Sequence, residues 1–209
     1  MTAGRDANGV PAGVTEAAHW GDDSPTVRSA RSRKHRSIGS EPTIPSESMV
    51  VMATWGAFAR QRPDLAAGGR ALLYQHGVGL AFLATISKDT GPRLHPMCPL
   101  LTDEALFAFT IPSPKQQDLR RDGRFAMHSF PCPDNEDAFY VTGRVTIVED
   151  RVLREDLLGK QFVHERSQFG AEFPADADAL FEFEIERGLL TKTTGHGDSN
   201  PQHVVWKPP

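Results

Sequence analysis

Runs of apolar residues divide most of the chain into short elements. From Phe139 to Ile147, apolar and polar side chains alternate with the period of two that a half-buried strand requires. Phe181, Phe183 and Ile185 alternate with glutamates in the same way, which predicts a strand with one dry face. Val78 to Ile86 is a continuous apolar run that ends at a Lys-Asp-Thr-Gly turn. A buried strand fits this run better than a helix does.

The remaining elements are short and closely spaced. Further strands are expected from Arg93 to Leu101, from Ala105 to Ile111 and from Arg124 to Phe130. Helices are expected from Trp55 with Thr54 as N-cap, from Pro63 to Tyr74, from Ser113 to Asp122 and from Arg151 to Val163. Such short connections require antiparallel pairing, because a parallel crossover needs a dozen or more residues. The pattern therefore predicts a mainly β domain, an antiparallel barrel or sandwich with peripheral helices.

Two prolines interrupt the strand expected from Arg93 to Leu101. Pro96 and Pro99 both lack the N–H group that a strand ladder uses. We therefore expect the later part of this strand to lie at a sheet edge, at a bulge or against a ligand.

The first 48 residues have a different composition. Trp20 is their only aromatic residue, and they show no apolar periodicity. Such a segment cannot offset the entropy of ordering itself, so 1–48 is expected to be a disordered tail and 49–209 the folded domain. Its basic run from Arg28 to Arg36 suggests either a patch for nucleic acid or anionic lipid, or, as favoured here, a solvated tail. A further interpretation is that translation starts at Met49 or Met52.

Charge and hydropathy exclude several classes of function. The net charge is −4, which argues against a nucleic-acid binder. No stretch approaches the roughly 18 apolar residues of a membrane-spanning helix. Only two cysteines are present, and the N-terminus lacks the layout of a secretory signal, so we expect a cytoplasmic protein.

The segment after the strand at Ala105 to Ile111 has the features of a phosphate site. Ser113 can cap a helix, Pro114 suits its first position, and Gln116 completes a capping box. The free N–H groups, the helix dipole and the Lys115 ammonium would converge on an anion. Arg93 could supply a second donor. The alternative is a plain helix start with an exposed lysine, beside an ordinary surface arginine.

These residues resemble a known family. The chain carries GPRLHP at 91–96, LFAFT at 106–110, SPK at 113–115 and DLRRDGRFAMHS at 118–129, with GRV at 143–145. In this order the motifs resemble the flavin-binding split-barrel proteins related to pyridoxamine 5′-phosphate oxidase. The resemblance implies a six-stranded antiparallel split β-barrel, a homodimer, and FMN bound in a cleft between the subunits.

The resemblance also implies roles for individual residues. Arg93 and Lys115 would hold the flavin phosphate, with Ser113 assisting. The residues expected along the ribityl chain and the isoalloxazine ring are Leu94, His95, Pro96, Phe109 and Thr110. Where the oxidase often has Arg-Lys, this chain has Pro114-Lys115, and it lacks the terminus that grips pyridoxal phosphate. We therefore expect an FMN-dependent oxidoreductase for a small organic substrate, and not vitamin B6 oxidation itself.

Three alternatives remain open at this stage. The barrel could bind a deazaflavin coenzyme, it could bind or degrade haem with His95 or His128 on the iron, or it could carry a flavin without catalysis. In the flavin enzyme, the same two histidines are candidates for protonating a substrate or a flavin nitrogen, since flavin chemistry needs little else from side chains. A packing role for His95 is the alternative. No metal site is expected, since the glutamates at 182, 184 and 186 and the tail residues His196, Asp198 and His203 match no closed ligand pattern.

Overall fold

The computed structural model describes residues 51–162 and 179–209. The expected N-terminal tail, its basic run and the end of the helix expected up to Val163 lie outside these residues. Within the described ranges, no helix is long and apolar enough to cross a bilayer.

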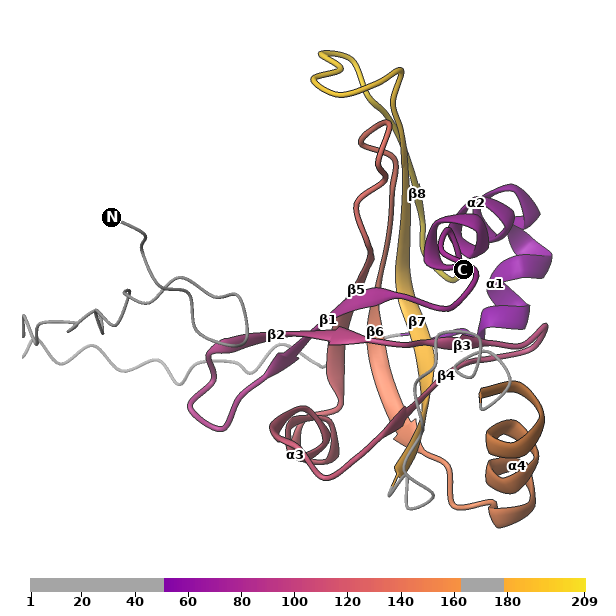
Figure 1. Ribbon diagram of the computed structural model, residues 1–209, viewed down its shortest axis with the longest axis vertical. Coiled ribbons are helices and arrows are strands. Elements are labelled where there is room, and N and C mark those ends of the chain that lie inside the picture. The colour runs from indigo at the N-terminus through magenta and orange to yellow at the C-terminus, as the bar shows by residue number, and fades with distance from the viewer. Residues whose placement is uncertain (1–50, 163–178) are drawn as a thin grey trace, which may run out of the picture. The chain divides into compact units, whose positions relative to one another are not determined.

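Two helices begin the described chain, as the sequence predicts. α1 (Trp55–Gln61) starts at Thr54, whose hydroxyl accepts a hydrogen bond from the N–H of Ala57 at 3.2 Å. α2 (Pro63–Leu73) starts at a proline, which needs no hydrogen-bond partner at that position. Both pack on one side of the sheet, beside β6 and β7 (Figure 1).

Eight strands form one antiparallel sheet in the order β2-β1-β5-β6-β7-β4-β3, with β8 paired to β7. Their bounds are β1 (Ala81–Ile86), β2 (Pro92–Met97), β3 (Leu100–Leu101), β4 (Leu106–Thr110), β5 (Arg124–Ser129), β6 (Ala138–Ile147), β7 (Ala179–Lys192) and β8 (Gln202–Trp206). The remaining helical segments are α3 (Pro114–Arg121), α4 (Arg151–Asp156) and the π-helix η1 (Leu157–Phe162). The mainly β class with peripheral helices is confirmed.

The strand expected from Arg93 to Leu101 is bent into two. β2 pairs with β1 at one edge of the sheet, and β3 pairs with β4 at the other. Only Cys98 and Pro99 separate β2 from β3, so one continuous segment forms both edge strands. The sheet therefore curls until its two edges come close together. If β2 and β3 are counted as one bent strand, they form with β1, β4, β5, β6 and β7 the six strands expected of a split barrel. β8 is an additional strand.

The longest pairing, between β6 and β7, contains a register shift between Thr142 and Gly143. A Cβ at position 143 would overlap the carbonyl oxygen of Glu184, so only glycine fits where the two strands approach. The shift strengthens the local twist and contributes to the curvature of the sheet.

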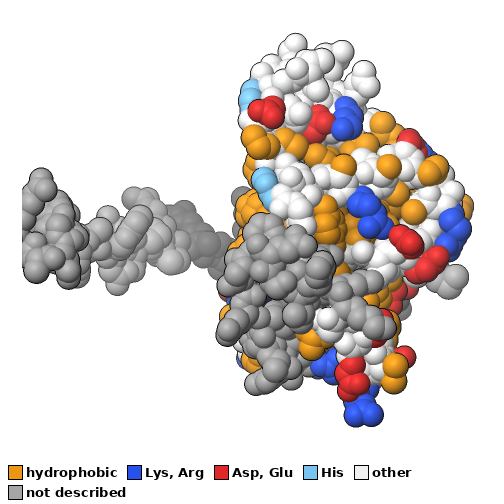
Figure 2. All heavy atoms as spheres, turned by 45° about the vertical axis from the view of Figure 1, so that its right-hand side comes forward, with side chains coloured by type: hydrophobic (Ala, Val, Ile, Leu, Met, Phe, Trp, Pro, Cys, Tyr) orange, Lys and Arg blue, Asp and Glu red, His pale blue; other side chains and the backbone are white. Residues whose placement is uncertain are grey.

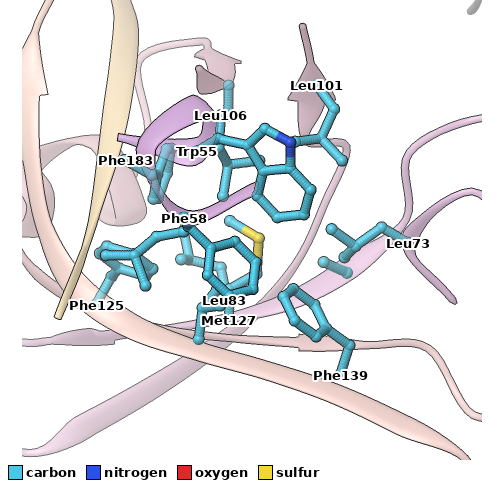
Figure 3. Packing of buried hydrophobic residues seen from close by; sticks show 14 of the residues in the cluster. Trp55, Phe58, Leu73, Leu83, Leu101, Leu106, Phe125, Met127, Phe139 and Phe183 are labelled. Carbon is cyan, nitrogen blue, oxygen red and sulfur yellow. The ribbon is translucent and has the colours of Figure 1, made fainter. Parts of the chain in front are cut away.

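The core lies between the inner face of the curled sheet and α1 and α2 (Figure 3). Trp55 and Phe58 pack edge to face, with ring centroids 5.3 Å apart. Phe139 and Phe183 are fully buried beside them. A second cluster on β4 and β7, which includes Phe107 and Leu180, packs with Leu157 at the start of η1.

The structure corrects three expectations about elements. The strand expected from Val78 begins at Ala81, because the N–H of Leu80 bonds the carbonyl of Leu73 and closes a turn after α2. The helix expected from Arg151 becomes a π-helix after Asp156. The C-terminal segment, in which the sequence predicts no strand, forms β8 along the second half of β7.

Candidate functional site

Strand alternation divides the predicted cofactor residues of β2 between two faces of the sheet. Arg93 and His95 lie on one face and are partly buried, whereas Leu94 and Pro96 lie exposed on the other. Leu94 is 65% exposed. Pro96 lies on an edge strand, as its missing N–H predicts. A single ligand can contact all four residues only by passing around the β2 edge.

The two candidate histidines also lie on opposite faces. Directly paired residues of neighbouring strands share a face, and successive residues alternate. Leu83 is fully buried and pairs with His95, whereas its neighbour Phe82 pairs with His128. His95 therefore faces the interior, and His128 faces outward. His128 Nδ1 lies 2.6 Å from the carbonyl oxygen of Ser129.

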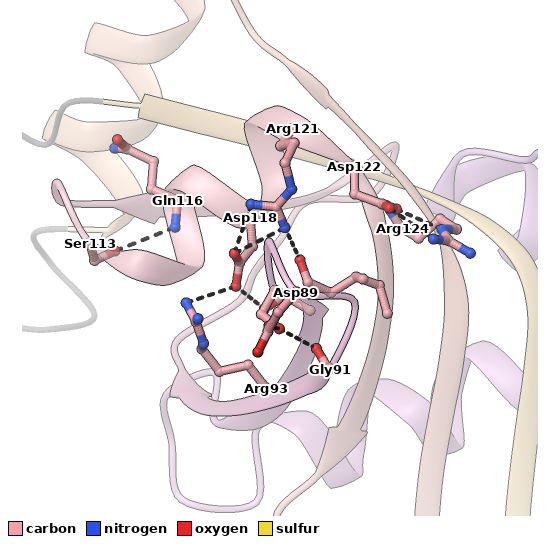
Figure 4. Close-up of polar contacts among 12 residues, drawn as sticks. Asp89, Gly91, Arg93, Ser113, Gln116, Asp118, Arg121, Asp122 and Arg124 are labelled. Carbon is pink, nitrogen blue, oxygen red and sulfur yellow. Dashed lines mark hydrogen bonds and ion pairs between the residues drawn. The ribbon is translucent and has the colours of Figure 1, made fainter. Parts of the chain in front are cut away.

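The start of α3 confirms one half of the predicted capping box. Ser113 Oγ accepts a hydrogen bond from the N–H of Gln116 at 3.4 Å and donates one to the carbonyl of Ile111 at 2.9 Å (Figure 4). The Gln116 side chain does not reach back to Ser113, because it is buried and contacts Thr110 at 3.3 Å instead. The N–H of Gln117 bonds the Ser113 carbonyl. The backbone donors expected to be free for a phosphate are thus largely used within the chain.

Phe109 and Thr110 are buried in the structure. Phe109 belongs to the cluster on β4 and β7, and Thr110 is 4% exposed with its hydroxyl bonded to Gln116. Their proposed contacts with a ribityl chain or a flavin ring stay a prediction.

One buried carboxylate organises the polar cluster between β1, β2 and α3. Asp118 Oδ2 accepts a hydrogen bond from Thr85 Oγ1 at 2.9 Å and forms an ion pair with Arg93 Nη1 at 3.1 Å. Asp118 Oδ1 accepts from both terminal nitrogens of Arg121 at 3.2 Å. Arg121 also donates to the carbonyl of Ile86 (Figure 4). The Asp118 side chain is only 3% exposed, so it fixes the guanidinium groups from inside the fold.

Lys115 lies one helical turn before Asp118 and faces the same strand. Its Nζ donates a hydrogen bond to the carbonyl of Pro96 at 3.0 Å. An ammonium group has three donors, so this bond leaves two for a ligand. Burial lowers the pKa of the Lys115 ammonium, and Cys98 acts against that shift.

His95 completes the cluster with an unsatisfied atom. Among the residues that the structure describes, its Nε2 is the one buried side-chain nitrogen or oxygen without a hydrogen-bond partner. Burial lowers the pKa of His95 below its ordinary value of 6.5, the charges of Lys115 and Arg93 lower it further, and Asp118 opposes them. The imidazole is therefore neutral at pH 7. A buried polar atom without a partner in a cationic setting fits a site that receives an anionic ligand.

Sequence reasoning singled out Arg93, His95, Ser113 and Lys115 but missed Asp118 as a site residue. Its spacing of three from Lys115 places both on one face of α3 and was the available signal. A buried acid cannot be recognised from spacing alone, because its burial depends on β1 and β2.

Two further hollows lie beside or beyond this cluster. One of about 390 Å³ is lined by residues 119–123 and 145–147, and two of its charged residues are already paired, Arg121 with Asp118 and Asp122 with Arg124. The other, of about 330 Å³, lies between the loops that precede β6 and β8 and includes His128 and His196. Within the described part of the chain, no group of three or more His, Cys, Asp or Glu side chains is placed to hold a metal ion.

The outer face of the sheet carries a row of apolar and aromatic side chains. The pairing registers place one residue from each of six strands in line across the sheet: Pro96, Phe82, His128, Tyr140, Leu189 and Val205. All six are exposed or half-buried. We call them the outer row. Phe82 also stacks on Phe130, with ring centroids 4.4 Å apart.

Comparisons with known proteins find likeness in structure but not in sequence. No protein-family model matches the chain, and no curated protein sequence does. One solved structure aligns with a TM-score of 0.51 and 16% identity over 69% of this chain and 93% of its own. A haem-binding protein from Mycobacterium smegmatis aligns with a TM-score of 0.49 and 12% identity over 66% of this chain, which spans 57% of that protein.

A third solved structure belongs to the pyridoxine phosphate oxidase family. It is a protein from Clostridium acetobutylicum related to general stress protein 26, with a TM-score of 0.46 and 13% identity over 66% of this chain and 95% of its own. The structural neighbours include the family that the sequence resembles. At these identities the likeness concerns the fold alone.

Proposed function

We propose that the protein binds FMN and uses it as an oxidoreductase for a small organic substrate. The observation that carries this proposal is the cluster at β2 and α3, where Arg93 and Lys115 lie beside the unpartnered Nε2 of His95. The side chains of Arg93, Lys115, Arg121 and Asp118 together carry a charge of +2. A phosphate dianion would neutralise this charge and give the buried nitrogen a partner.

The donors of the cluster suit a phosphate group. Asp118 holds Arg93 through Nη1, so the other N–H groups of the guanidinium can contact phosphate oxygens. Lys115 is held at Pro96 with two N–H groups to spare. Because the Ser113 hydroxyl already donates to Ile111, we assign phosphate binding to the two cations and a capping role to Ser113.

The rest of the flavin would pass around the β2 edge. Leu94 and Pro96 are exposed on the outer side of that edge and can take the contacts proposed for them along the ribityl chain. When bound, FMN supplies hydride transfer, and the protein orients the ring. His128 lies on the outer face, so of the two histidines it is placed to give a proton to a substrate there. His95 belongs to the phosphate cluster.

A homodimer is part of the proposal. On the face drawn in Figure 2, hydrophobic side chains lie among uncharged polar groups, and Lys, Arg, Asp and Glu lie at its top, bottom and right-hand side and near its centre. Several large hydrophobic residues are exposed, among them Leu94 and Val205, which is 45% exposed. A contiguous exposed apolar surface marks an interaction site, and a second copy of the chain would cover it.

The direct test is the absorbance spectrum of the purified protein, followed by denaturation and mass identification of the released cofactor. Released FMN with flavin peaks near about 370 and 450 nm supports the proposal. Released haem or F420, named in neighbours of this fold, in a protein that does not take up FMN would overturn the cofactor assignment. If FMN is bound but no electron acceptor is turned over, the protein is a flavin carrier and not an oxidoreductase.

A further inference from the structure

We propose that binding of the phosphate group is coupled to protonation of His95, so that the site takes up a proton with its anion. This inference rests on the proposed function, since it concerns the same cluster. It assigns His95 a role in binding that neither packing nor flavin chemistry requires.

The placement of His95 carries the inference. It lies two residues after Arg93 on the inner face of β2, and α3 brings Lys115 and Asp118 to the same place. Its neighbour across the ladder on β1 is the uncharged Leu83. The Nε2 atom is buried and has no partner among the described residues. An acceptor that arrived with the ligand would satisfy this nitrogen if it carried a proton.

The net positive charge around His95 is neutralised when a phosphate dianion binds. Without ligand, Arg93 and Lys115 oppose a positive charge on the imidazole, and Asp118, already shared with Arg121, compensates only in part. Cys98 also lies near Lys115 and acts against the lowering of the Lys115 pKa. A phosphate dianion brings two negative charges and cancels the cluster's net charge of +2. The protonated imidazole then gains a charge-assisted hydrogen bond, so its pKa rises on binding.

The direction of proton transfer on binding, uptake or release, shows whether the protein or the ligand changes its protonation. A phosphate monoester has a second pKa of about 6, and a cationic site lowers it, so the ligand can only release protons near pH 7. Uptake must come from a protein group. Lys115 is the competing group, because burial lowers its pKa as well.

Calorimetric titration of FMN in buffers of different ionisation enthalpy measures the proton balance directly. At a pH between the free and the bound pKa of His95, uptake of up to about one proton per site is expected. Riboflavin, which lacks the phosphate, should bind without uptake. The uptake should be lost in His95→Gln and kept in Lys115→Arg. His76→Gln, at an exposed histidine after α2, is the matched control and should keep it.

Three results would overturn the inference: no uptake in the wild type, unchanged uptake in His95→Gln, or equal uptake with riboflavin. A protein that binds no FMN contradicts the proposed function instead. The inference is then tested with inorganic phosphate on the unmodified chain, by following the His95 imidazole in an NMR pH titration. A pKa that rises with phosphate supports it, and a pKa that does not move contradicts it.

Discussion

Asp118 determines where the guanidinium of Arg93 lies. The carboxylate is buried, but its two arginine partners are each more than a third exposed, so water can solvate them when the carboxylate is removed. Asp118→Asn should therefore lower the free energy of unfolding by roughly 1–2 kcal/mol, less than a fully buried ion pair would lose. Urea denaturation measures this loss.

Asp103→Asn is the matched control, since Asp103 pairs with Arg70 at 3.5 Å but is fully exposed. A surface pair of this kind contributes about 0–1 kcal/mol. Equal stability of the two variants would contradict the role of Asp118.

A second prediction at the residue scale concerns Lys115 and the affinity for FMN. Lys115→Ala removes two donors that the proposal assigns to phosphate, so FMN should bind more weakly by about 1.5–3 kcal/mol. Lys207→Ala, near the C-terminus, should leave the dissociation constant unchanged. Arg93→Ala should act in the same direction as Lys115→Ala. Both contact one phosphate in the proposal, so their effects need not add. An unchanged constant in Lys115→Ala contradicts the assignment.

The sequence predicted which cations meet, but not how they are held. Arg93 opens a strand and Lys115 opens a helix, and both positions follow from local patterns. The burial of His95 Nε2 and the three partners of Asp118 depend on how α3 packs on β1 and β2. Local spacing places Lys115 and Asp118 on one face of α3 but does not determine these tertiary contacts.

At the scale of elements, β8 shows how a short segment is stabilised by its neighbours. Trp206 packs on Phe58 of α1 with ring centroids 4.8 Å apart, and its Nε1 donates to Gln61 Oε1 at 3.2 Å. The side chain is 7% exposed. Trp206→Ala should therefore cost about 3–5 kcal/mol of stability, measured by thermal or urea unfolding.

Val204→Ala, two residues earlier on the same strand and 38% exposed, should change the stability by less than about 1 kcal/mol. If Trp206→Ala unfolds no more easily than Val204→Ala, the strand does not depend on its tryptophan.

Patterns within one element predicted the type of most elements, whereas features that depend on pairing or on a turn were not predicted. Alternation predicted β6 and the first part of β7, and of the three settings predicted from the prolines, an edge, a bulge or a ligand, the structure shows the edge at β2. β8 was missed because Gly, Ser and Asn precede it and its short apolar run becomes a strand only against β7. The π-helix after Asp156 likewise follows a sequence typical of an α-helix.

At the scale of the molecule, the outer row predicts how the chain assembles. Val205 lies at one end of the row and is 45% exposed in the single chain, so Val205→Arg should fold normally. In a dimer that buries the row, the new charge would be desolvated, and the equilibrium should shift toward monomer. Analytical ultracentrifugation at several concentrations measures this shift.

Val152→Arg makes the same change on α4, where the valine is 72% exposed and outside the row. It should leave the dimer intact. A wild-type protein that is monomeric at all concentrations, or a Val205→Arg variant as dimeric as Val152→Arg, would contradict the proposed interface.

The central claim is that Arg93 and Lys115 hold a flavin phosphate, and FMN and riboflavin differ only in that group. The most direct measurement is therefore the affinity of the cofactor-free protein for each, at one pH and one salt concentration. Riboflavin loses the charge-assisted hydrogen bonds of both cations, each worth about 1.5–3 kcal/mol, so FMN should bind at least about 10-fold more tightly than riboflavin. Equal affinity for the two would show that the cluster at β2 and α3 does not hold the phosphate.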